Sequence, residues 1–193
     1  MSHAQAYSRL VFPDTVRVFG VALQPVTIGH GLILWRIESP FIVGGKAEAR
    51  HIVAALLALR CKTARDADRL LNSWRGRLLI RCWGKQVKRL SVVTKTLAEA
   101  QIRNHVRGAY DGPSLWGRDE EATKNRCSAP YLTILKVRLM DYLHLSPEAA
   151  LDYPIGQAVW DLACYAEYRG SMSWMSEEDS DVISELKRRA NAA

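Results

Sequence analysis

The segment KAEARHIVAALLALR, residues 46–60, predicts the class of the fold. Ile52, Leu56 and Leu59 recur at the three- and four-residue spacing that places side chains on one face of an α-helix. The alanines between them add helix propensity. We therefore expect an amphipathic helix here that packs through its apolar face.

Residues 63–82 continue the helical pattern. Thr63 is a favourable N-cap residue, and Asp66 suits the positive end of the helix dipole. Apolar side chains then recur at helical intervals, at Ala67, Leu70, Leu71, Trp74, Leu78 and Cys82. These intervals predict one amphipathic stripe that faces the core, with Gly76 and Gly84 as candidate points of interruption.

The N-terminal side combines a strand with a further helix. Residues 16–23, VRVFGVAL, are rich in β-branched side chains and predict a short strand that Gln24-Pro25 ends. Thr27 is expected to cap a helix that ends at Ser39-Pro40, because the residue before a proline avoids the α region. Residues 41–43 are expected to form an apolar connection.

The motif Gly29-His30-Gly31 stands in the first turn of that helix. Two glycines weaken a helix, so they require a reason for being there. We interpret them as the site of a close backbone approach at the helix start. The alternative is a nest of backbone N–H groups that binds an anion.

The last third of the chain is also predicted to be helical. Pro130 is expected at the first position of a helix, Ser146 caps the next one, Pro154 separates two helices and Gly170 ends the last of them. A final helix is expected after Ser176, with acidic residues in its first turn and basic residues near its end.

Residues 108–129 form the longest loop-like segment, which follows a predicted helix over 96–107. This loop is a candidate domain boundary or functional loop. We expect a mainly α fold, an irregular helical bundle with a short N-terminal β-strand or hairpin. It forms a single domain over residues 1–193, with the loop as the candidate point of subdivision.

The chain of 193 residues is basic, since 27 Lys and Arg stand against 20 Asp and Glu, for a net charge of +7. Hydrophobic residues make up 48%, an ordinary globular composition that excludes a disordered chain and a polytopic membrane protein. The positive charge is concentrated: residues 75–107 hold nine basic side chains and a single acid, Glu99.

Four of these basic residues, Arg77, Arg81, Lys85 and Lys88, lie at i, i+4, i+8 and i+11. If the helix continues past Gly84, they form one cationic stripe. Three interpretations remain open: a solvated helix face, a contact surface for an acidic protein, and a surface that binds the phosphates of a nucleic acid.

Known catalytic and metal-binding motifs are missing from the sequence. Cys61, Cys82, Cys127 and Cys164 are too widely spaced for a zinc site, so we expect reduced and mostly buried thiols. The histidines lack metal-ligand spacing, and neither a nucleophile elbow nor a phosphate-binding glycine loop is found. We expect no metal, no cofactor and no enzymatic activity.

Two further expectations concern location and contact. The N-terminus has no apolar run of a signal peptide, and the apolar segments are too short to span a bilayer, so we expect a cytoplasmic protein without membrane contact. Trp116 and Trp174 lie in polar surroundings and are candidate interface residues, unless each covers a helix end or the edge of the core.

Two segments carry a family resemblance. LQPVTIGHGLILWRIESPFI (23–42) and ALDYPIGQAVWDLACYAEYRG (150–170), followed by an acidic SEEDSD, resemble small proteins from the tail-gene modules of phages and prophages, in the position of tail assembly chaperones. The resemblance implies a tail assembly factor or virion-associated protein in the host cytoplasm. It would act by protein–protein contacts with a tail component, shielding the hydrophobic helices of the tape measure protein. The alternative is a nucleic-acid-binding protein that uses residues 75–107.

Overall fold

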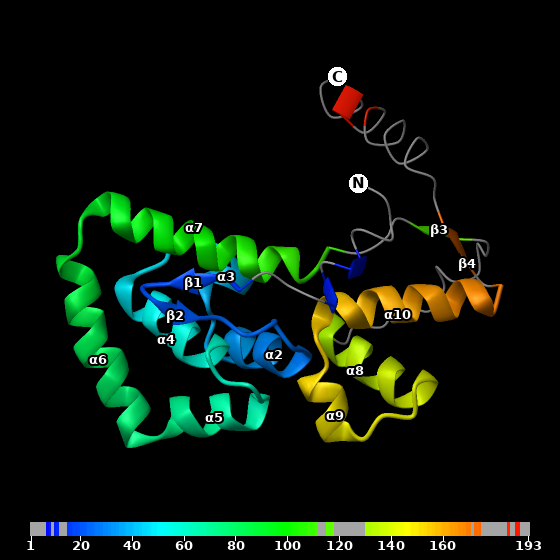
Figure 1. Ribbon diagram of the computed structural model, residues 1–193, viewed down its shortest axis with the longest axis horizontal. Coiled ribbons are helices and arrows are strands. Elements are labelled where there is room, and N and C mark those ends of the chain that lie inside the picture. Colours follow the sequence, from blue (N-terminus) through cyan, green and yellow to red (C-terminus); the bar gives the residue numbers. More distant parts are fainter. Residues whose placement is uncertain are drawn as a thin grey trace.

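A computed structural model describes residues 7, 8, 10, 11, 15–111, 115–117, 130–170, 172–174, 185, 188 and 189. Within them the fold is mainly α with a short antiparallel hairpin near the N-terminus, which confirms the predicted fold class (Figure 1). The final helix predicted after Ser176 lies outside the described residues except for Glu185, Arg188 and Arg189, which are helical.

The hairpin replaces the single strand predicted over 16–23. Strands β1 (Arg17–Val18) and β2 (Val21–Ala22) pair antiparallel. Phe19 and Gly20 between them both have positive φ, 51° and 77°, the backbone conformation of a two-residue hairpin turn. Val18 is fully buried, and β1 packs against helix α7 (Val92–Gly108).

Helix α4 (Ala49–Leu59), predicted from the apolar spacing of residues 46–60, is the centre of the larger part of the molecule. Its Ile52, Leu56 and Leu59 are all buried, as predicted. The helices around it are α2 (Ile28–Arg36), α3 (Pro40–Val43), α5 (Ala64–Asn72) and α6 (Trp74–Arg89). In Figure 1, α5, α6 and α7 enclose α4 on three sides, and each of them packs against it.

The smaller part contains α8 (Tyr131–Tyr142), α9 (Pro147–Asp152) and α10 (Ile155–Tyr168). A second two-stranded antiparallel sheet pairs β3 (Leu115–Gly117) with β4 (Met172–Trp174) beside α10. Ser146 caps α9 and Pro154 separates α9 from α10, as predicted, whereas Pro130 is the N-cap of α8 and not its first residue. Residues 40–43 also differ from the prediction, because they form helix α3.

The N-terminal end of α2 joins the two parts. The Ile28 N–H donates to the Tyr153 carbonyl at 3.0 Å, and the Ile155 N–H donates to the Val26 carbonyl at 2.9 Å. These bonds occupy backbone groups at the starts of α2 and α10 that have no partner within their own helix. Helix α2 also packs against α4 and α5 in the larger part and against α8 and α9 in the smaller one.

Gly29 and Gly31 permit this central packing. A Cβ atom at position 29 would overlap the Cβ of Ala64, and one at position 31 would lie 2.6 Å from a methyl carbon of Leu132. The two glycines therefore allow α5 and α8 to approach the backbone of α2. This confirms the interpretation of the Gly29-His30-Gly31 motif as a close backbone approach.

The capping residues complete the start of α2. The Thr27 hydroxyl accepts a hydrogen bond from the His30 N–H at 3.2 Å, and the His30 Nδ1 accepts one from the Thr27 N–H at 3.4 Å. His30 thus takes the part that Glu or Gln plays in the usual capping box. Since these donors already have partners, the motif does not present them to an anion.

Adding one methyl group at Gly29 tests this arrangement. Gly29→Ala is expected to lower the free energy of unfolding by about 1–3 kcal/mol, the usual cost of overpacking a filled interior. Gly84→Ala is the matched control, because a Cβ there would meet no described atom closer than 3.9 Å. That variant should gain up to about 1 kcal/mol from alanine's helix propensity. Denaturant unfolding of both variants measures the difference, and equal effects would contradict the close approach at Gly29.

Candidate functional site

Helix α6 carries the strongest concentration of charge in the described structure. The helix continues through Gly84 to Arg89, so the condition set for a cationic stripe is met. Its sixteen residues include six cations and no acidic residue. All six are exposed: Arg75, Arg77, Arg81, Lys85, Lys88 and Arg89.

The four predicted stripe residues share one side of α6. With about 100° of rotation per residue, they fall within an arc of about 80°. With about 1.5 Å of rise per residue, Arg77 and Lys88 lie about 16 Å apart along the axis. The structure therefore brings Arg77, Arg81, Lys85 and Lys88 together as one basic stripe.

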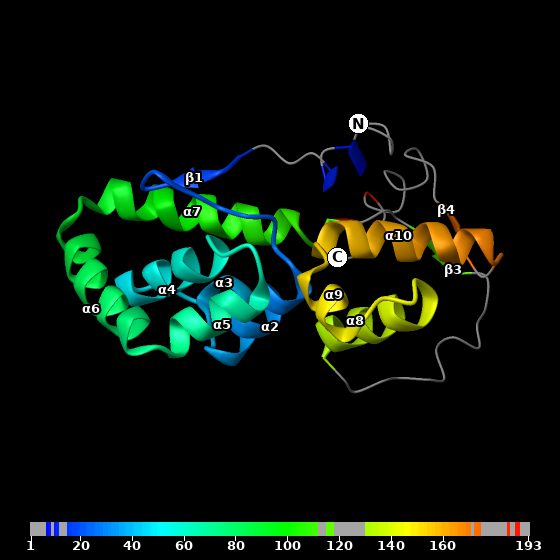
Figure 2. The same cartoon turned by 60° about the horizontal axis from the view of Figure 1, so that its bottom comes forward.

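The basic stripe faces away from the core. Gly76 and Val87 are buried about 140° and about 120° around the helix from the centre of the stripe. Gly84, about 60° from that centre, is buried at the margin of the stripe, where α6 packs against α4. Figures 1 and 2 both place α6 at the edge of the molecule, at the end remote from α8, α9 and α10. A long ligand can thus lie along the outer face of α6 without meeting the smaller part.

Carboxylates do not neutralise the stripe within the described part of the chain. The described ion pairs of Asp68, Glu48, Glu99, Glu148 and Glu185 are made with other arginines. Glu99, the single acid between positions 75 and 107, pairs with Arg103 at 2.8 Å. The four side chains of the stripe therefore have no described carboxylate partner and are accessible to an external anion.

Trp74 overturns part of the sequence prediction. The apolar stripe predicted over residues 63–82 does not continue as one helix, because Ser73 ends α5 and caps α6. Ala67 and Leu71 are buried as predicted, but Trp74 is 65% exposed, Leu78 is 50% exposed and Cys82 is also exposed. The break changes the rotational phase, so the later apolar positions face solvent.

A local signal for this break is present in the sequence. Ser73 stands three residues before Gly76, and the Ser73 hydroxyl accepts a hydrogen bond from the Gly76 N–H at 2.9 Å. Serine in the middle of a helical pattern favours an N-cap, because its side chain competes for backbone N–H groups. Periodicity alone does not reveal this break, and it therefore places Trp74 in the core.

Trp116 and Trp174 lie in strands rather than loops. Trp116 pairs with Ser173 and Leu115 pairs with Trp174 in the β3–β4 sheet, so the two tryptophans stand one register position apart. Their side chains lie outside what the structure describes, and their role as interface residues stays a prediction.

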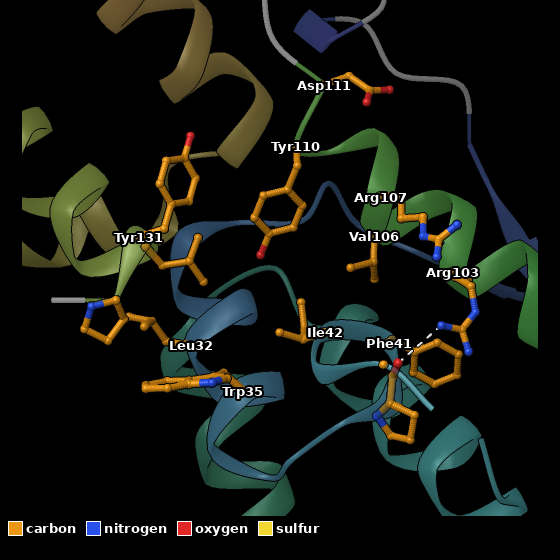
Figure 3. Close-up of a pocket in the computed structure, with 14 residues that line it drawn as sticks. Leu32, Trp35, Phe41, Ile42, Arg103, Val106, Arg107, Tyr110, Asp111 and Tyr131 are labelled. Atoms are coloured by element: carbon orange, nitrogen blue, oxygen red, sulfur yellow. Dashed lines mark hydrogen bonds between the residues drawn. The ribbon is translucent and has the colours of Figure 1, made fainter. Parts of the chain in front are cut away.

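A pocket of about 740 Å³ lies between α2, α3, α7 and α8 (Figure 3). Apolar and aromatic side chains dominate its lining, among them Leu32, Trp35, Phe41, Ile42, Tyr110 and Tyr131. Trp35 is 48% exposed, and Figure 3 shows Tyr110 extending into the space between α2 and α8. A pocket of this size and character suits an apolar group.

Hydrogen bonds hold Arg103 in place at this pocket. Arg103 bonds Glu99 at 2.8 Å and donates to the carbonyls of Pro40 and Gly45 at 3.3 and 3.1 Å. Burial raises the pKa of Tyr110 to about 12, with a smaller contribution from Tyr131. The Tyr110 hydroxyl therefore stays protonated and able to donate a hydrogen bond.

Among the described histidines, burial lowers the pKa of His30, and His105 is near enough for its charge to lower that pKa further. The two side chains nevertheless have separate hydrogen-bond partners. His30 is fully buried, the Nε2 of His105 bonds the Gln24 carbonyl at 2.9 Å, and His144 is exposed after α8. Among the described residues, no group of three or more His, Cys, Asp or Glu is placed to hold a metal.

The expectation of mostly buried cysteines is wrong for the three that are described. Cys61 is half-buried, while Cys82 and Cys164 are exposed as free thiols, and Cys127 lies outside the described residues. Cys82 follows the change of phase at Ser73, which places it on the outer side of α6.

Comparisons with protein-family models, with curated proteins and with solved structures give no match. The resemblance to phage tail-module proteins thus stays a prediction. None of the described helices combines the length and apolar character that crossing a membrane requires.

Buried histidines make the stability sensitive to acid. Burial lowers the pKa of His30 and of His105, and the bond of His105 to Gln24 opposes this only in part. Below about pH 6.5 these histidines are protonated in the unfolded chain more readily than in the folded chain. The free energy of unfolding therefore decreases as the pH is lowered. Each histidine contributes a slope of up to about 1.4 kcal/mol per pH unit.

Denaturant unfolding from about pH 7 to about pH 5 measures this slope. His105→Gln keeps an N–H donor but does not titrate, so the variant should show a shallower slope than the unmodified chain. A slope that is the same in both would show that His105 does not contribute.

Proposed function

We propose that this protein binds nucleic acid through the basic stripe on α6. The observation that carries the proposal is a helix with six cations and no acidic residue, whose outward side has no carboxylate partner among the described residues. Binding of a polyanion to such a surface is favourable, because each phosphate contact releases condensed counterions.

The lack of hydrogen bonds and ion pairs at the side chains of the stripe, within the described structure, supports phosphate contact rather than a structural role. Arg103 lies outside the stripe and is occupied by Glu99, Pro40 and Gly45. Arg77, Arg81, Lys85 and Lys88 form no such bonds from their side chains to described residues. A stripe of uncompensated cations repels itself, and an anionic partner relieves this repulsion.

Charge reversal at the centre of the stripe tests the proposal. Arg77→Glu with Arg81→Glu should lower the affinity for DNA or RNA by at least tenfold and reduce the salt dependence of binding, because about two phosphate contacts are lost. The control is Arg138→Glu with Arg169→Glu, which makes the same change of charge at exposed positions of the smaller part. Equilibrium binding across a salt series measures both variants.

If both double variants lose the same affinity for nucleic acid, then net charge alone accounts for binding. That result would contradict a site on α6. Unchanged affinity after reversal of Arg77 and Arg81 would remove nucleic acid as the ligand of the stripe. An acidic protein would then be the partner to test.

A second candidate function is assembly of a phage tail through protein–protein contacts. The two segments behind the family resemblance, residues 23–42 and 150–170, meet in one unit through the bonds of Ile28 with Tyr153 and of Ile155 with Val26. Residues of the first segment also line the apolar pocket of Figure 3. In this proposal the pocket takes an apolar helix of a tape measure or other tail protein, in the host cytoplasm or in the virion.

Co-expression with the tape measure protein of the same phage or prophage tests this second function. The intact chain should raise the soluble yield of the tape measure protein, and Trp35→Asp at the pocket should remove most of the gain, because the charge cannot be buried in an apolar contact. Trp74→Asp, on the other surface, is the control. If neither variant changes the yield, the pocket is not the contact site.

A further inference from the structure

We infer that the surface of α6 selects single-stranded over duplex nucleic acid, with Trp74 as the platform on which a base stacks. This inference rests on the proposed function and names the form of the ligand. Its starting point is the position of an exposed tryptophan at the head of the basic stripe.

Trp74 and the stripe share one side of the helix. Trp74 is the first residue of α6, and Arg77, Leu78 and Arg81 follow it at i+3, i+4 and i+7. Together with Lys85 and Lys88 they lie within an arc of about 100° and over about 21 Å of helix axis. The same surface therefore offers an aromatic ring, an exposed leucine and four cations in a row.

The backbone at the α5–α6 corner holds Trp74 outward. The Ser73 N–H donates to the Arg69 carbonyl at 3.1 Å, and the Ser73 hydroxyl donates to the Leu70 carbonyl at 2.7 Å while accepting from Gly76. A Cβ at position 76 would overlap the Leu70 carbonyl, so this tight corner needs glycine there. Trp74 thus projects from a rigid corner without serving the core.

The environment of the Trp74 ring is cationic. The Arg75 guanidinium lies over the ring at 5.6 Å from its centroid. A large aromatic surface in water is unfavourable, and no described hydrophobic side chain covers this one enough to bury it. An aromatic ring among cations instead matches a ligand that is apolar on its faces and anionic along its backbone.

Single-stranded nucleic acid has this combination of properties. Its bases expose faces that stack on aromatic side chains, while its phosphates follow a basic surface. In a duplex the base faces are stacked on one another and closed to Trp74. Basic residues alone attract both forms through their phosphates, so the tryptophan supplies the preference.

Binding of labelled oligothymidylate, and of a duplex of equal length, to the full chain tests the inference by fluorescence anisotropy. The unmodified protein should bind the single strand more tightly. Trp74→Ala should weaken single-strand binding by about tenfold while leaving duplex binding and the salt slope nearly unchanged. Trp74→Phe should retain most of the affinity, because a phenyl ring also stacks.

Tyr168→Ala is the matched control, since it removes an exposed aromatic side chain from α10, in the smaller part of the protein, and should leave both affinities unchanged. Far-UV circular dichroism checks that each variant is folded. A Trp74→Ala variant that binds the single strand as tightly as the intact chain, or that weakens both ligands equally, would overturn the inference.

These measurements separate the stacking platform from the basic stripe. If Arg77→Glu with Arg81→Glu weakens binding and Trp74→Ala does not, the nucleic-acid function stands and the stacking platform fails. A preference of the unmodified protein for the duplex would also remove the platform and leave the function in place. Binding of neither form at low salt would overturn both, and would favour an acidic protein as the partner of α6.

Discussion

The close approach of helices to the backbone of α2 is the constraint on which the rest of the fold depends. At Gly29 helix α5 comes so near that a methyl group would overlap its Ala64. At Gly31 the side chain of Leu132 from α8 fills the corresponding space. The Thr27–His30 capping pair and the backbone bonds to residues 153 and 155 hold this end of the helix in place. One short helix thereby connects the larger part of the molecule to the smaller one, and a single buried cluster runs from β1 to α10.

This arrangement decides which surfaces are left for partners. Because α4 packs against α6 at Gly84 and α5 packs against it at Gly76, the cations of that helix are left on its exposed side. The corner at Ser73 then adds Trp74 and Leu78 to the same outward side. The pocket beside Trp35 arises separately, where α2 and α3 meet α7 and α8. The cationic and aromatic surface on α6 therefore differs in chemistry from the apolar pocket between the two parts of the described structure.

Sequence patterns predicted the helices of this fold better than they predicted which side chains are buried. Spacing in residues 46–60 predicted α4 and its buried face, and Thr63, Ser146 and Pro154 were identified correctly as caps or breaks. The basic stripe was predicted residue by residue, because a helical interval fixes the face once the helix is continuous. The core assignment of Trp74, Leu78 and Cys82 failed for the same reason, since the cap at Ser73 interrupts the helix and resets its phase.

By itself the sequence determined the mainly α class, the starts of the helices capped by Thr27, Thr63 and Ser146, and the gathering of positive charge between residues 75 and 107. All of these follow from local intervals and from capping chemistry along the chain. Only the tertiary structure decided which helices, α5 and α8, approach Gly29 and Gly31, that residues 26–28 bond to residues 153–155, and that Trp74 joins the basic stripe. These depend on which distant segments meet and on how one helix turns against another, and no local periodicity encodes either.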